Sequence, residues 1–164
     1  MERTVRKQLT AATFMTLVAT SAFAANKVSE IDVSVDLPAI ENAEAAAVWT
    51  SLGTDLETAI AERITPILGE DGTEVVIDIN EVALASAFEN AYALEDSQLI
   101  GDVQIQNPGW LNDNDFELSV TAVQAVSAAS PEVDISQLTI ASEEVYEAMI
   151  TAFANNVSEK LLNN

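Results

Sequence analysis

Apolar residues recur along this chain with two different periods, and the order of those periods is the strongest constraint on its fold. In four segments every second residue is apolar, the pattern of a strand that buries one face. These predicted strands cover residues 28–37, 73–84, 98–106 and 115–124. In the second strand the apolar phase slips near Glu81, which predicts a bulge or a bend there.

Two further segments repeat their apolar residues every three to four positions, the period of a helix with one buried face. The first predicted helix covers residues 42–65, and its apolar stripe comprises Val48, Trp49, Leu52, Leu56, Ile60 and Ile64. The second is capped by Ser142, and its stripe comprises Val145, Met149, Phe153, Val157 and Leu161. Residues 126–141 are predicted to connect the last strand to this helix, with a short strand over 135–140 as an alternative.

The resulting order, β-α-β-β-β-α, predicts an α+β domain of two layers. A helix between two strands favours a right-handed crossover and a parallel pair, and the later strands would add as a meander, so the sheet should be mixed. Because each strand has one apolar face, both helices should pack on the same face of the sheet. Phe153 would then meet the apolar row of the first strand or that of the fourth. We find no second domain boundary and expect one domain over residues 25–164.

The first 24 residues have the three parts of a secretory signal peptide. Arg3, Arg6 and Lys7 form a basic start, residues 9–18 are mostly apolar, and Ala22-Phe23-Ala24 is a small-x-small cleavage pattern. The apolar stretch is shorter than the roughly 20 residues that a transmembrane helix needs. We therefore expect a periplasmic or secreted bacterial protein with no membrane insertion after cleavage.

The charge of the chain is strongly negative. It has 27 acidic and 6 basic residues, a formal charge of −21, and cleavage would leave 26 acidic and 3 basic residues, a charge of −23. Such a surface repels the phosphates of nucleic acid, so we expect no nucleic acid partner. Solubility in a salty surrounding is the simplest explanation of the acidity. A basic protein, a basic peptide or a cation as partner is the alternative.

The residue inventory excludes several kinds of catalytic site. The chain has no histidine and no cysteine, which rules out Ser-His-Asp and Cys-His arrangements and zinc or haem sites built on those residues. The best metal candidate is a weak Ca²⁺ site at Asp113, Asp115 and Glu117, where oxygen ligands alternate on a turn. The spacing does not match an EF-hand loop, and a solvated hairpin loop explains the same residues. No other cofactor is expected.

The polar face of the predicted sheet is a second candidate site. Asp32, Asp78 and Asp102 should project from three strands on the side away from the helices, where they could receive a basic peptide or a cation. The alternative is that this face is simply the solvent side of a two-layer domain. Trp110 follows Pro108-Gly109 in a predicted hairpin loop and is a candidate partner contact, or else folds back onto its own core.

These observations predict a small exported protein without catalytic activity, whose role is to bind a partner or to support the cell envelope. The alternative from another functional class is a Ca²⁺-dependent or carboxylate-based hydrolase, which would need converging carboxylates in a concave pocket. The sequence alone does not identify the partner.

The signal peptide generates a direct prediction. Protein isolated from its native host should begin at Ala25, because the small residues at positions 22 and 24 fit a signal peptidase site. Intact-mass measurement reads the start of the chain. A major species that retains residues 1–24 would contradict export by cleavage.

Overall fold

The computed structural model describes residues 27–35, 47–80, 94–109 and 114–163. Within them lie four strands, β1 (Val28–Ser34), β2 (Thr73–Ile79), β3 (Gln98–Gln106) and β4 (Asn114–Thr121). The α-helices are α2 (Leu52–Arg63), α4 (Ala122–Ala129) and α5 (Glu143–Leu162), and short 3₁₀ turns lie at Thr65–Ile67, Leu94–Asp96 and Ile135–Gln137. The predicted signal peptide, residues 1–24, lies outside the described residues.

The four strands form one mixed sheet in the order β1-β2-β3-β4. β1 pairs parallel with β2, and β2, β3 and β4 follow as an antiparallel meander. The register of β1 shifts between Val28 and Glu30, where Ser29 is the extra residue of a bulge. This is the mixed sheet that the sequence predicts, with α2 as the crossover between the two parallel strands.

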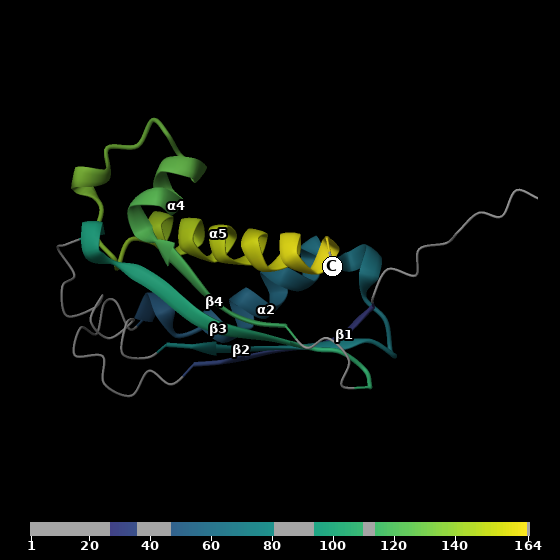
Figure 1. Cartoon of the computed structure of the whole chain (residues 1–164). Helices are drawn as coiled ribbons and strands as arrows, with labels where there is room; N and C mark the ends of the chain where they lie inside the picture. The colour runs from purple at the N-terminus through teal and green to yellow at the C-terminus, as the bar shows by residue number, and fades with distance from the viewer. Residues whose placement is uncertain (1–26, 36–46, 81–93, 110–113, 164) are drawn as a thin grey trace, which may run out of the picture.

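The helices α2, α4 and α5 lie on the same side of the sheet, and α5 runs along its length (Figure 1). The α+β fold and the single helical layer are therefore confirmed. The inward residues of β2 and β3 are almost completely buried, as Val75, Ile77, Leu99 and Val103 show, each at 0% exposure, whereas Phe116 and Leu118 of β4 are half-buried. The predicted stripe of the last helix is buried along its whole length.

Phe153 packs against the middle of the sheet. Its side chain is fully buried, and a Cβ atom added to Gly101 of β3 would lie 3.0 Å from its Cζ atom and 3.1 Å from Cδ1 of Ile79. Gly101 thus leaves the space that the ring fills. The sequence placed Phe153 over the first or the fourth strand. Its ring reaches Gly101 of β3, the strand position without a side chain, and Gly101 is the register partner of Leu118 in the predicted fourth-strand row.

A polar cluster joins α2 to α5 at one end of the core. Trp49 is fully buried, donates its indole N–H to the carbonyl of Ile140 at 3.0 Å, and meets the ring of Tyr146 edge to face at 5.0 Å between centroids. The Tyr146 hydroxyl donates to Oδ2 of Asp55 at 2.5 Å. Burial, and then the hydrogen bond to Asp55 and its negative charge, raises the pKa of Tyr146 well above its usual range. The hydroxyl therefore stays protonated and keeps the two helices connected.

The first predicted helix is interrupted by a turn within the described residues. Residues 47–49 are helical, a turn follows at 50–51, and α2 begins only at Leu52, so the continuous helix over 42–65 is wrong at this point. Residues 42–46 lie outside the described residues. Thr50 and Ser51 are weaker helix formers than their neighbours, and Gly53 follows within the first turn of α2. The stripe from Leu52 to Ile64 is nevertheless buried as predicted.

The end of the fourth strand is a second difference. The alternation extended the strand to residue 124, but β4 ends at Thr121 and α4 begins at Ala122. Thr121 is the N-cap, and its hydroxyl accepts a hydrogen bond from the backbone N–H of Gln124 at 3.4 Å. The alternative strand over 135–140 is also wrong, since a 3₁₀ turn lies at Ile135–Gln137. The described residues thus contain a helix, α4, that the sequence did not predict.

The last helix begins where the sequence predicts, but its cap works differently. Ser142 occupies the N-cap position, yet its hydroxyl accepts from the backbone N–H of Thr139 at 3.0 Å instead of capping the helix. Ser158, further along α5, is buried, and its hydroxyl has no hydrogen-bond partner within the described part of the chain. None of the described helices combines the length and the apolar character that crossing a membrane requires.

The packing of Phe153 generates the second prediction. The variant Phe153→Ala should lose about 3–5 kcal/mol of unfolding free energy, because removing a fully buried ring leaves a cavity over Gly101. Urea unfolding of the variant and the wild type measures the loss. Leu162→Ala is the control, because Leu162 lies on the same helix at 50% exposure and its truncation should have little effect. Equal losses in the two variants would contradict the central place of Phe153.

Candidate functional site

The outer face of the sheet is the side that the described helices leave uncovered. Asp32, Asp78 and Asp102 all lie on this face and are exposed, so the structure brings the three sequence-predicted aspartates to one surface. The face is also polar elsewhere; its other exposed side chains include Glu30, Ser34, Glu74, Gln104, Gln106, Asp115, Glu117 and Ser119. It is a shallow, acidic surface built from alternate residues of four strands.

Three carboxylates stand in one row across this face. Asp78 is the register partner of Asp102, and Asp102 is the register partner of Glu117. Ser34 extends the row on β1, and its hydroxyl donates to Oδ1 of Asp78 at 3.3 Å. Like charges directly opposite each other destabilise a sheet, so this row lowers the stability of the domain. Asp32 lies one row away, opposite Val76.

The weak calcium candidate is only partly described. Asp115 and Glu117 lie on the outer face of β4, whereas Asp113 is outside the described residues, as is Trp110. Among the described residues no group of three or more Asp and Glu side chains is arranged to hold a metal ion. The Ca²⁺ site and the contact through Trp110 therefore stay predictions.

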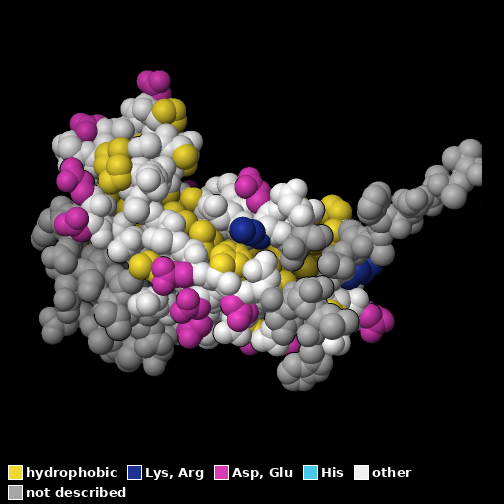
Figure 2. Space-filling model, viewed as in Figure 1, with side chains coloured by type: hydrophobic (Ala, Val, Ile, Leu, Met, Phe, Trp, Pro, Cys, Tyr) yellow, Lys and Arg dark blue, Asp and Glu magenta, His cyan; other side chains and the backbone are white. Residues whose placement is uncertain are grey.

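Negative charge predominates on the surface as well as in the sequence. Figure 2 shows acidic side chains spread over the visible face and few basic ones, with hydrophobic side chains gathered between the helices and the sheet. Two of the basic side chains are engaged within the fold. Arg63 donates to Oδ1 of Asn155 and to the carbonyl of Ala59, each at 2.6 Å, and Lys160 lies 5.4 Å from the centroid of the Phe116 ring.

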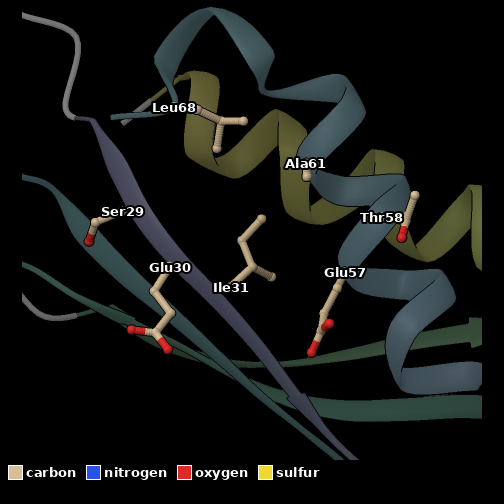
Figure 3. Close-up of a pocket in the computed structure, with 7 residues that line it drawn as sticks. All are labelled: Ser29, Glu30, Ile31, Glu57, Thr58, Ala61 and Leu68. Carbon is tan, nitrogen blue, oxygen red and sulfur yellow. The ribbon is translucent and has the colours of Figure 1, made fainter. Parts of the chain in front are cut away.

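A groove between β1 and α2 is a further candidate, which the sequence did not reveal. It has a volume of about 340 Å³ and is lined by Ser29, Glu30, Ile31, Glu57, Thr58, Ala61 and Leu68 (Figure 3). Ile31 projects between the strand and the helix, and Glu57 reaches from α2 toward β1 (Figure 3). The groove thus combines an apolar floor with two carboxylates. We call it the β1–α2 groove.

The free edge of β1 is covered on both sides of this groove. At one end the backbone N–H of Gly69 donates to the carbonyl of Val28 at 2.9 Å. At the other end Oε1 of Glu57 accepts the backbone N–H of Val33 at 3.2 Å. Gly53 of α2 also lies beside Val33, since a Cβ atom added to Gly53 would be 3.0 Å from the Val33 carbonyl oxygen. The helix therefore satisfies or shields the strand edge at Val33.

Between these two contacts the backbone of Ile31 is left without a partner. In a paired strand, alternate residues direct their N–H and C=O groups to the neighbouring strand and the others direct them outward. The backbone N–H and C=O of Val33 point to the free edge of the sheet, because they face α2. Ile31, two residues earlier, therefore points its backbone groups to the same edge. Among the described residues, no hydrogen bond from outside the β1–β2 pair reaches the N–H or C=O of Ile31. The groove therefore lies beside one backbone donor and one acceptor that point to the free edge of the strand.

The arrangement of the groove suits binding. A sheet edge recognises an added strand through main-chain hydrogen bonds and through pockets for alternate side chains. The groove offers a backbone donor and acceptor and an apolar side chain, with carboxylates nearby. The sequence signal that could have indicated it is Gly53 near the start of the helix, because a glycine there permits close approach of another backbone. Glu57, one turn later, is the side chain that uses this approach.

Comparison with protein families, with curated proteins and with solved structures finds no match to this chain. The function of the chain is therefore inferred from its own residues and geometry.

The acidic row generates the third prediction. The variant Asp102→Asn should gain about 0.2–1 kcal/mol of unfolding free energy, because it removes the charge that faces both Asp78 and Glu117. Urea unfolding measures the gain, which should shrink near 1 M NaCl, where the Debye length is about 3 Å. Asp115→Asn is the matched control, because Asp115 faces the neutral Gln104. Equal gains in both variants would assign the effect to net charge alone.

Proposed function

We propose that this protein is exported, acts in the periplasm or outside the cell as a non-catalytic binding module, and takes its partner at the β1–α2 groove. A role in supporting the cell envelope would use the same contact. The observation that carries the proposal is the interruption in the covered edge of β1, where Ile31 has no backbone partner among the described residues.

The edge of β1 supports binding because the fold covers its neighbours. Buried or sheltered backbone groups are nearly always hydrogen-bonded, and here both flanking positions are bonded by Gly69 and Glu57. The uncovered stretch of the β1 edge lies between two covered positions and above the apolar floor of the groove. This arrangement favours binding of a specific partner there. The acidic outer face adds a negative potential along one side of the groove.

Export is supported by the sequence of residues 1–24, and the charge of the chain is compatible with it. The absence of cysteine means that a protein of this kind would not depend on an oxidising compartment for its stability. The folded domain would then depend on core packing alone wherever it acts.

The fourth prediction tests where the partner binds. A photoreactive amino acid placed at Thr58, an exposed residue of the groove, should cross-link a partner in envelope preparations of the native host. The same amino acid at Ser127, an exposed residue of α4 that does not line the groove, is the control. A cross-linked species specific to position 58 is expected on gels and by mass spectrometry. Equal cross-linking at both positions, or none at position 58, would overturn the assignment of the groove.

A further inference from the structure

We propose that the partner at the β1–α2 groove is an extended peptide segment in which an apolar residue is flanked by basic residues, and that it pairs antiparallel with β1 at Ile31. This inference rests on the proposed function and specifies its partner. Three properties of the groove carry it: the unpaired backbone of Ile31, the apolar floor and the carboxylates along the outer side.

The backbone of Ile31 sets the mode of binding. In an antiparallel pair, a residue opposite Ile31 would exchange two hydrogen bonds with it, donating its own N–H to the Ile31 carbonyl and accepting the Ile31 N–H. Because Gly69 and Glu57 cover the edge on either side, the pairing is limited to a short stretch centred on this residue. A single extended segment fits this geometry, whereas a long added strand does not.

The floor of the groove sets the chemistry of the central residue. Residues directly opposite each other in a sheet project their side chains on the same face. The side chain opposite Ile31 would therefore lie on the helix side of the sheet, among Ile31, Ala61 and Leu68. Leu68 is one of the few large apolar residues left exposed in the described part of the chain, at 40%. Covering it favours a valine or a similar apolar side chain at the centre of the peptide.

The outer face sets the charge of the flanking residues. Side chains next to the central residue would point to the opposite face, beside Glu30 and Asp32, which are both exposed. Neither carboxylate has a hydrogen-bond or ion-pair partner among the described residues. Basic side chains there would meet two free carboxylates on a chain whose formal charge is −21. Charge complementarity therefore favours lysine or arginine on both sides of the apolar residue.

The same charges argue against a second copy of this chain as the occupant. Pairing of two β1 edges would bring Glu30 and Asp32 of one copy close to the same residues of the other. Both copies also carry the same negative net charge, so they would repel each other. Like charges opposite each other destabilise such a pair. A basic segment from a different protein avoids this cost.

The test is an NMR titration of the ¹⁵N-labelled protein with an acetylated and amidated pentapeptide, Thr-Lys-Val-Lys-Thr. We expect shifts confined to the amides that line the groove, and slower hydrogen exchange at the Ile31 amide, which points to the free edge of β1. The peptide Thr-Glu-Val-Glu-Thr should not bind. A peptide methylated on the valine nitrogen should bind about ten-fold more weakly or not at all, because it cannot donate to the Ile31 carbonyl.

Variants of the protein separate a local contact from general attraction. Glu30→Gln should raise the dissociation constant of the lysine peptide about two- to five-fold, the effect of one partly exposed charge pair. Glu117→Gln removes the same charge from the outer face of β4, at the opposite edge of the sheet, and should leave binding nearly unchanged. Equal effects of the two variants, equal binding of the methylated peptide, or shifts outside the groove would overturn the inference.

Failure of this inference is distinguishable from failure of the proposed function. If no pentapeptide binds while position 58 still cross-links a partner, the groove is a binding site for a partner of different chemistry, and only the inference fails. If both experiments fail, the proposed function fails with it.

Discussion

The close approach of α2 to the edge of β1 is the contact on which the groove and the proposed function depend. Gly53 allows the helix backbone to come near the Val33 carbonyl, and Glu57, one turn later, accepts the N–H of the same residue. The helix is thereby held at one end of the strand edge. The turn at residues 68–69 holds the other end through Val28. Together they cover the edge at Val28 and at Val33, and Ile31 lies between these two contacts.

A chain with 27 acidic residues and no cysteine is stable only if its carboxylates stay outside the apolar core. The inward faces of the strands are mostly apolar, and the described helices cover that face alone. The carboxylates are left to the outer face and the helix surfaces, where water screens them, although Asp78, Asp102 and Glu117 still oppose one another. Packing such as that of Phe153 on Gly101 offsets this repulsion, since no disulfide contributes.

Periodicity predicted the elements well because most of them bury a single face. The third strand was bounded correctly, and the stripe from Val145 to Leu161 is buried as expected. The start of α4 was missed because Ala122 suits the inward side of a strand as well as a helix, and the cap formed by Thr121 decides between them. The β1–α2 groove depends on contacts between residues more than twenty positions apart, such as Val33 and Glu57, which no local pattern reveals.

An open sheet has two edge strands. The partial cover of β1 leaves a short binding position on one of them without leaving the whole strand open. Unpaired edge strands invite pairing with other chains, and proteins limit this by short edges, bulges and charged side chains. β1 combines a bulge at Ser29, the cover at Val28 and Val33, and the charges of Glu30 and Asp32. The backbone of Ile31 lies between the two covered positions and points to the free edge. Such an opening is too short to template aggregation, yet it has the donor, the acceptor and the apolar floor that a single extended segment needs.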